Sequence, residues 1–313
     1  MLVHIGYQKA SSTFLQQRLF LPQHGYWQLY REKQDVLRFN AFFVDPPAFK
    51  FDADAVRQEL QARLSAIPDP SLVPVISAEI LVGIPIDAAM GTSRANADRI
   101  VECVPDARVL VIVREQRSLI LSRYLQFVRG GGVRSLEEFA HGPHDTELAR
   151  SKWTGVYPAF FEYDRLISYY RQRLGAERIL VLAFEQLRED PVGYLRSICA
   201  FAGAQTDLEK VDRSPVKEAI PASTLGARRI ANALVTIDPD NPFSRAMPAG
   251  VYWRGARHAK RWIDAAGRRF DSTRSRAKLT ARLERILGDF YVESNRRLAA
   301  MTGLDLAKYG YRT

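Results

Sequence analysis

Short apolar runs alternate with segments of helical periodicity along the first two thirds of the chain. Four of these runs have the length and the β-branched content of buried strands: 1–5, 72–81, 107–115 and 178–185. Apolar residues recur at helical spacing in the segments between and after them: 13–20, 52–67, 94–104, 118–130, 158–175, 191–203, 220–235 and 278–306. This alternation predicts an α/β fold, a central parallel sheet flanked by helices, with any binding site at the carboxyl ends of the strands.

The pattern changes after residue 205, where no further apolar strand-like run follows. Segment 238–253 is rich in Pro, Gly and Asn and is typical of a long loop. No stretch of disordered composition separates a second domain. We therefore expect a single domain over 1–313, with an α/β core over 1–205 and a helical and loop extension over 206–313.

The composition is that of an ordinary globular protein with a basic surface. Lys and Arg number 45 against 35 Asp and Glu, which gives a net charge of +10 and a sequence pI of about 9.7. Such a field attracts anions, whether nucleotides, acidic glycans, nucleic acids or membrane headgroups. Much of the excess lies in 251–290, where eleven basic residues accompany four acidic ones, and a solvated helical face is the simpler explanation for most of them.

The cellular compartment is predicted from the cysteines and from the amino terminus. Cys103 and Cys199 each lie in an apolar stretch, as expected of buried thiols, so a disulfide framework is not indicated. The first residues lack the pattern of a secretory signal, and no apolar run reaches membrane-spanning length. We expect a soluble, cytoplasmic protein.

The loop after the first predicted strand has the layout of an anion-binding site. In "GYQKASSTF", Lys9 supplies a positive charge, and Ser11, Ser12 and Thr13 place hydroxyl donors at the start of the next helix. Backbone N–H groups at such a helix start point toward the same spot. The sequence therefore predicts a phosphate or sulfate site, although the three hydroxyls could serve only to cap the helix.

Two features argue against a site for ATP with bound magnesium: the spacing of the loop lysine and the arginine that ends the third predicted strand. The spacing of Lys9 from Gly6 does not fit G-x-x-x-x-G-K-[ST]. The third apolar run ends in Arg114, where a P-loop NTPase usually carries an aspartate for the metal. An arginine there attracts a second anion, and Ser122 in the following helix could donate to the same group. An ion pair between Arg114 and Glu115 is the alternative.

These residues resemble those of the sulfotransferases that use 3′-phosphoadenosine 5′-phosphosulfate (PAPS), in particular the bacterial and carbohydrate-modifying branches. "HIGYQKASSTFLQ" is similar to the family's 5′-phosphosulfate loop, G-x-x-K-x-G-[ST]-[ST], and "VIVREQRSLILSRY" to its 3′-phosphate motif. "PVISAEIL" and "ILVLAFEQLREDPVGYLRSICAFAG" also resemble stretches of those branches. The likeness runs from Leu2 to about Gly203 and more weakly to the C-terminal "YGY".

The resemblance implies a P-loop-like sulfotransferase fold, PAPS as donor, adenosine 3′,5′-bisphosphate as product, and no metal. Lys9 would hold the phosphosulfate and stabilise charge on the bridging oxygen. The remaining cofactor-binding residues that it implies are Ala10, Ser11, Ser12, Thr13, Arg114, Ser122, Arg228 and Arg229. The 1–205 core would bind the nucleotide, and the 206–313 extension would contribute to acceptor and nucleotide binding.

One position departs from the family pattern. The loop glycine of the family is replaced by Ser11. Either the backbone avoids a positive φ at this position or it bears some strain.

Sulfuryl transfer to a hydroxyl or amine also needs a base for the acceptor proton. Glu79, at the end of the second predicted strand, is the first candidate, and a structural ion pair or cap is an almost equal alternative for it. His24 is the second candidate for the catalytic base. His4 is expected in the core, and the pair His141 and His144 lacks a further ligand at zinc spacing.

The acceptor itself is left open by the sequence: a glycan, a glycolipid or a small metabolite is compatible. Aromatic residues are the candidate acceptor contacts: Tyr26, Trp27, Tyr252 and Trp253. The basic and aromatic segment 252–262 is a candidate for holding an anionic acceptor or a membrane headgroup. The oligomeric state is not indicated.

Two other functions compete with sulfuryl transfer. A small-molecule kinase using ATP and Mg²⁺ is disfavoured by the Lys9 spacing and by Arg114. A basic nucleic-acid-binding protein is suggested by the pI alone, but no known binding motif accompanies it, so we expect no nucleic-acid partner.

Overall fold

A computed structural model describes residues 1–83, 85, 91–140, 156–214, 221–235, 262, 263, 265, 267 and 272–313. The chain divides into two compact units. Unit 1 comprises Met1–Glu115, Glu162–Val216 and Tyr291–Thr313, and unit 2 comprises Gln116–Phe161 and Lys217–Phe290. The grouping therefore does not follow the expected boundary at residue 205, since the last segment of the chain belongs with the sheet. The expectation of a single domain stays a prediction.

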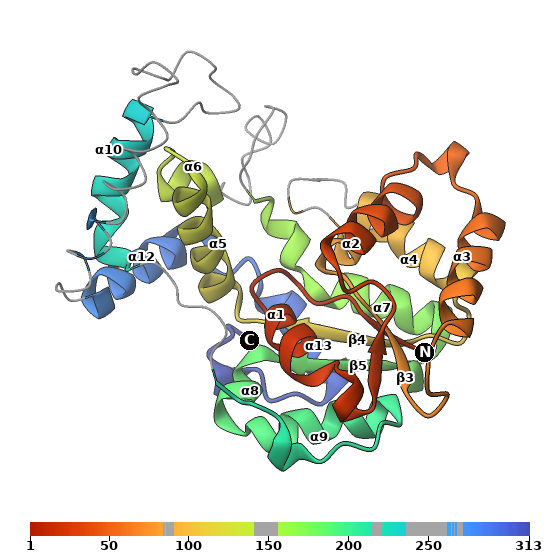
Figure 1. Cartoon of the computed structure of the whole chain (residues 1–313). Coiled ribbons are helices and arrows are strands. Elements are labelled where there is room, and N and C mark those ends of the chain that lie inside the picture. The colour runs from red at the N-terminus through yellow and green to blue at the C-terminus, as the bar shows by residue number, and fades with distance from the viewer. Residues whose placement is uncertain are drawn as a thin grey trace. The chain divides into compact units, whose positions relative to one another are not determined.

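Unit 1 is built on one five-stranded parallel sheet (Figure 1). Its strands, in spatial order, are β2 (Tyr26–Gln28), β3 (Val73–Ser77), β1 (Leu2–His4), β4 (Arg108–Val113) and β5 (Ile179–Ala183). The four strands predicted from apolar runs are confirmed. The fifth, β2, was not predicted, because it lies at the edge of the sheet, where a continuous apolar run is not required.

Helices cover the sheet of unit 1, and the α/β class is confirmed. Their bounds are α1 Ser12–Phe14, α2 Lys33–Phe39, α3 Ala53–Ser65, α4 Gly91–Cys103, α7 Tyr163–Leu174, α8 Phe184–Glu189, α9 Pro191–Ala202 and α13 Val292–Thr302. Helix α9 contacts β4 and β5, and α7, which contacts β5, lies on the opposite face of the sheet (Figure 1).

Short helical turns connect these elements in unit 1. Two are π-helical, η1 Leu15–Leu19 and η3 Asn40–Val44. The 3₁₀ turns are η2 Pro22–His24, η4 Ala48–Lys50, η5 Glu79–Val82, η8 Ala176–Arg178, η9 Leu208–Lys210 and η11 Ala307–Tyr309. Helix α1 runs directly into η1, so the helix predicted after the anion loop is confirmed over Ser12–Leu19.

The sequence pattern explains where the helices begin and what they bury. Asp52 caps α3, because its Oδ1 accepts the Ala55 N–H at 2.9 Å. Val56 and Leu60 from the predicted apolar face of that helix are buried. The five apolar residues Val109–Val113 of β4 are fully buried, as a central parallel strand requires.

Unit 2 consists of helices. Its described elements are α5 Gln116–Gly130, α6 Leu136–Ala140, η7 Pro158–Phe161, η10 Ala222–Thr224, α10 Leu225–Val235 and α12 Ser272–Leu287. Helix α5 packs on α6, α10 and α12. The predicted helical segment 278–306 is two helices, α12 and α13, which are separated at Gly288 by a positive φ of 49°.

No helix among the described residues is both long and apolar enough to span a membrane.

Candidate functional site

The loop predicted to bind an anion begins where β1 and β4 leave the sheet together. Beyond β1, Ile5 N–H donates to the Leu110 carbonyl at 3.0 Å and Tyr7 N–H to the Ile112 carbonyl at 3.4 Å. The two strands thus stay paired up to their carboxyl ends. Lys9 and Arg114, which follow those ends, are brought to the same place on the sheet edge.

The backbone of the loop is left-handed at two residues that are not glycine. Lys9 has a φ of 71° and Ser11 a φ of 67°, whereas Ala10 between them does not have a positive φ. An alternation of this kind turns successive backbone N–H groups toward one concave spot that suits an anion. Each left-handed residue with a Cβ costs about 1–2 kcal/mol. The replacement of the family glycine by Ser11 therefore preserves the positive φ and carries strain.

The Ser11 side chain contacts a residue that the sequence did not point to. Its Oγ lies 3.2 Å from the hydroxyl of Tyr194 in α9. Tyr194 is buried, and burial raises its pKa far above the usual value, so it stays a neutral phenol. This contact helps to hold Ser11 in its unfavourable backbone conformation. Ala10 is buried, with its N–H donated to the Tyr7 carbonyl at 3.1 Å.

Close packing of the His4 and Ser12 side chains against the backbone explains why residue 6 is a glycine. A Cβ at Gly6 would lie 2.5 Å from His4 Nε2 and 3.2 Å from Ser12 Oγ. Both of these polar atoms are buried and have no hydrogen-bond partner among the residues that the structure describes. A buried hydroxyl without an acceptor, at the start of the helix, is a group that a bound oxyanion can satisfy. Thr13, in the first helical turn, is half-buried.

His4 is a core residue, as expected, and it is held in place by a polar network. Its Nδ1 lies 2.8 Å from Ser77 Oγ at the end of β3, and Gln16 Nε2 donates to the same Oγ at 3.1 Å and to the Ser77 carbonyl at 3.0 Å. Burial lowers the pKa of His4 to about 3, so its ring is neutral. The network joins β1, β3 and the helix that follows the loop.

Arg114 is the second cation of the site and is fixed by hydrogen bonds and by a ring contact. Its Nη1 donates to the Lys9 carbonyl at 2.6 Å. Its guanidinium lies over the ring of Phe184, 4.6 Å from the centroid, and its own carbonyl accepts the Tyr163 hydroxyl at 2.6 Å. A planar guanidinium held in this way presents its fork of donors in a defined direction.

A half-buried carboxyl supports the backbone beside Arg114. Glu185 Oε1 accepts the Glu115 N–H at 3.1 Å, and Oε2 accepts the hydroxyl of Tyr311 at 3.3 Å. Burial raises the pKa of Glu185. Neither Glu185 nor Tyr311 was predicted from the sequence, and only their places within the resembling stretch 179–203 and in the terminal "YGY" could have indicated them.

Glu79 is placed at the same sheet edge as Lys9. It is the first residue of η5, directly after β3, and it is half-buried. Because β3 pairs with β1, with Ser77 opposite His4, Glu79 and Lys9 follow neighbouring strands. Its role as a base stays a prediction.

The assignment of His24 as the alternative base needs correction. His24 ends η2 just before β2, which runs parallel to β3 with Tyr26 opposite Val73. It therefore lies at the amino edge of the sheet, whereas Lys9 lies at the carboxyl edge. Its ring is largely buried, and its carbonyl accepts the Thr206 hydroxyl at 2.7 Å, as in a structural turn.

Tyr26 also needs correction as an acceptor contact. Its side chain is fully buried, packs edge-on against Phe20, and donates its hydroxyl to Cys199 Sγ at 3.4 Å. No face of the ring is left for a ligand. Trp27, whose side chain points to the other face of the sheet, is half-buried and lines a cavity.

Three of the predicted nucleotide contacts belong to unit 2. Ser122 is buried within α5, and Arg228 is buried in α10. Arg229 Nε donates to the Val133 carbonyl at 2.9 Å, so it holds the chain after α5. Their roles in nucleotide binding stay predictions. Tyr252, Trp253 and the basic residues around them lie outside the described residues, as do His141 and His144.

Comparison with known proteins agrees with this architecture. Residues 5–207 match the model of a family described as the sulfotransferase family. The fold is similar to the crystal structure of a sulfotransferase from Alicyclobacillus acidocaldarius, with a TM-score of 0.50 and 22% sequence identity over 74% of this chain and 92% of that chain. No curated protein matches the chain significantly.

Proposed function

This chain belongs to the sulfotransferase family, and from that premise we propose that it transfers a sulfuryl group from PAPS to a hydroxyl or amine of an acceptor. The observation that carries the proposal is the contact between the two cationic residues. Arg114 donates to the Lys9 carbonyl, so the groups assigned to the two ends of the donor nucleotide share one sheet edge.

The residues of unit 1 fit a doubly phosphorylated nucleotide. Lys9 and the left-handed loop around Ala10 and Ser11 would hold the 5′-phosphosulfate, with donors from Ser12 and Thr13. The unsatisfied hydroxyl of Ser12 supports this assignment. Arg114 would bind the 3′-phosphate. The contacts assigned to Ser122, Arg228 and Arg229 rest on the family resemblance.

Sulfuryl transfer requires the protein to position the reactants, to stabilise developing charge and to remove a proton from the acceptor. PAPS supplies an electrophilic sulfur and a phosphate leaving group. The Lys9 ammonium would stabilise the negative charge that develops on the bridging oxygen. Glu79, at the end of the neighbouring strand, would accept the proton of the acceptor hydroxyl or amine.

The donor is tested by binding. Isothermal titration of the protein in EDTA should show saturable binding of adenosine 3′,5′-bisphosphate and much weaker binding of ADP. Lys9→Ala should weaken it strongly, while Lys210→Ala, which removes an exposed surface lysine paired with Asp207, should leave it unchanged. Preference for ATP with Mg²⁺, or salt-dependent RNA or DNA binding without a response to the bisphosphate, would refute the proposal.

Transfer is tested with radiolabelled PAPS and fractionated host extract, since the acceptor is a glycan, glycolipid or small metabolite still to be identified. Label should pass to an acceptor in the presence of wild-type protein and not with Lys9→Ala. Equal transfer of label by the wild type and by Lys9→Ala would show that Lys9 is not needed for the reaction.

A further inference from the structure

A cavity of about 380 Å³ lies in unit 1 beside the edge strand β2. This volume is within the range of small-molecule binding sites. Its walls come from β2, from the end of the helical segment after the anion loop, and from α2 and α3. The residues that matter here are Phe20, Trp27, Gln28, Arg31, Glu32 and Asp35.

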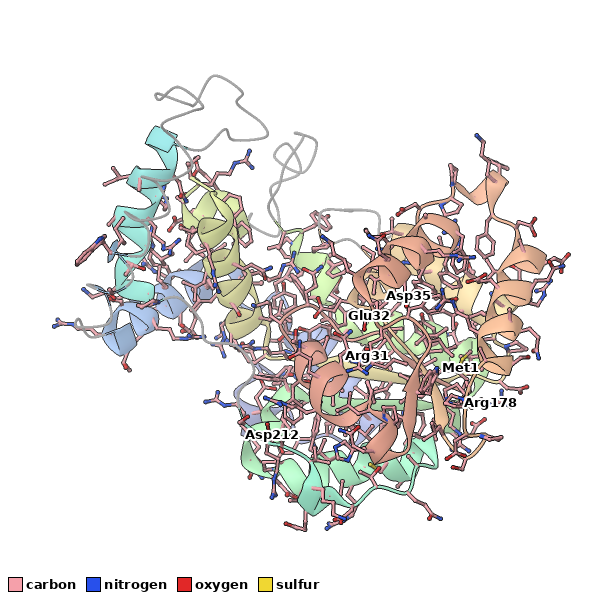
Figure 2. All side chains as sticks on the ribbon, viewed as in Figure 1. Met1, Arg31, Glu32, Asp35, Arg178 and Asp212 are labelled. Carbon is pink, nitrogen blue, oxygen red and sulfur yellow. The ribbon has the colours of Figure 1, made fainter. Side chains whose placement is uncertain are left out.

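The cavity combines an aromatic wall with a rim of balanced charge. Phe20 is buried, and Trp27 is half-buried, so part of the indole is available to a ligand. Figure 2 shows Arg31, Glu32 and Asp35 close together. Asp35 is paired with Arg63 at 3.0 Å, whereas Arg31 and Glu32 are exposed. Two basic and two acidic side chains favour a ligand without net charge that can both donate and accept hydrogen bonds.

Gln28 adds an oriented acceptor. Its Nε2 donates to the Gln16 carbonyl at 2.9 Å and to the Phe20 carbonyl at 2.8 Å. Both N–H groups of the amide are thereby used, which leaves Oε1 as the polar atom that can accept from a ligand. A hydroxyl is the complementary group.

The same side chain links the cavity to the anion loop. Gln16, whose carbonyl is bonded to Gln28, also donates through Nε2 to Ser77, and Ser77 contacts His4 behind Gly6. The chain of contacts therefore runs from the cavity through η1 to the end of β1. A ligand that contacts Gln28 therefore touches one end of this chain of hydrogen bonds.

From this arrangement we infer that the cavity is a binding site for a neutral saccharide ring. The sugar's apolar face would stack on the accessible part of Trp27, and its hydroxyls would pair with the Arg31 and Glu32 side chains at the rim. Gln28 leaves the strand on the opposite face from Trp27, so its Oε1 would accept from a hydroxyl that reaches round the strand edge. Saccharide binding does not depend on the proposed sulfuryl transfer.

Saccharide binding is tested without any donor. Cellobiose, maltose and chitobiose are titrated into the full-length protein and followed by saturation-transfer NMR. At least one should bind the wild type, and Trp27→Ala should weaken it by about tenfold, through loss of the stacked ring. Phe49→Ala is the matched control, because Phe49 is an exposed aromatic residue of η4 that does not line the cavity, and it should bind like the wild type.

A second variant guards against loss of folding. Arg31→Ala with Glu32→Ala changes only the exposed rim and should also weaken binding of the disaccharide, with an unchanged thermal unfolding midpoint. Binding of none of the three disaccharides, equal binding by Trp27→Ala, or binding of 4-nitrophenol in their place would overturn the inference. Binding of adenosine 3′,5′-bisphosphate is measured in parallel, so failure of the donor proposal is seen separately from failure of the saccharide site.

Discussion

The side chain of Arg114 donates a hydrogen bond from Nη1 to the backbone carbonyl of Lys9 at 2.6 Å, across 105 residues of sequence. The bond uses one of the five N–H donors of the guanidinium to fix the position of the other cation's backbone. Because Lys9 is held in a left-handed conformation, the carbonyl that Arg114 needs is presented at the right place only while the loop keeps that strained shape.

Arg114→Lys should weaken binding of adenosine 3′,5′-bisphosphate by about tenfold, although the charge is kept. An ammonium cannot bond to the Lys9 carbonyl, stack on Phe184 and form a two-point contact with a phosphate at the same time. Isothermal titration at low and moderate salt measures the change.

The control for this substitution is Arg178→Lys. Arg178, labelled in Figure 2, precedes β5 at the amino edge of the sheet and bonds to the Pro105 carbonyl, so the affinity should not change. Equal affinities for Arg114→Lys and wild type would show that Arg114 acts only as a structural residue.

At position 11, glycine should be better tolerated than alanine. Both substitutions remove the contact with Tyr194, but alanine keeps the cost of a positive φ and glycine removes it. We expect Ser11→Gly to be more stable than Ser11→Ala by about 1 kcal/mol in urea unfolding.

Ser197, inside α9, is the control position, because there the expected order of stability of the alanine and glycine variants is reversed. Its backbone is helical, and there alanine should be more stable than glycine by about 1 kcal/mol. If Ser11→Ala equalled or exceeded Ser11→Gly, the loop would not have the left-handed backbone described above.

Neutral His4 makes stability depend on pH. Burial lowers its pKa from the usual 6.5 to about 3, so between these values the unfolded chain binds a proton that the folded chain does not. The stability due to this residue is fully present above pH 6.5 and falls as the pH falls toward 3, by up to about 1.4 kcal/mol per pH unit.

This contribution is measured as the difference in unfolding free energy between wild type and His4→Gln from pH 8 to pH 4. The difference should shrink as the pH falls, because glutamine does not titrate. His24→Gln is a parallel variant, since burial also lowers the pKa of His24. A difference for His4→Gln that stays constant over this range would mean that His4 takes up a proton as readily in the folded protein as in the unfolded chain, so that its pKa is not lowered.

Glu79→Gln should lower sulfuryl transfer by about 100-fold or more while leaving bisphosphate affinity near that of the wild type, because glutamine cannot take a proton but preserves the shape. Glu209→Gln, at an exposed position of η9, should transfer normally. Full activity of Glu79→Gln would assign the base to another residue.

Much of the fold could be predicted because its strands are buried on both faces. Buried parallel strands need continuous apolar runs, and the runs that became β1, β3, β4 and β5 are visible without any partner. The edge strand β2 was missed for the same physical reason. As an edge strand it pairs only with β3, and its residues Tyr26, Trp27 and Gln28 do not form a continuous apolar run.

The anion-binding chemistry of the loop could be predicted because Lys9 and the three hydroxyl residues lie close together in the sequence. Arg114 could be predicted because it directly follows an apolar strand. His24 and Tyr26 were misassigned because closeness in sequence to the loop says nothing about the edge or face of the sheet. One helical segment and one turn carry the chain back to the amino edge before β2 begins.

By itself, the sequence determined which segments are strands and helices and which short loop carries charge and hydroxyls, since apolar periodicity and local side-chain chemistry are properties of neighbouring residues. Only the tertiary structure decided that Arg114 meets Lys9, that Ser11 is held left-handed against Tyr194, and that Trp27 and Gln28 border a cavity linked to the loop. Those relationships depend on the order of the strands and on packing between distant segments, where the free energy of burial outweighs the local preference of each residue.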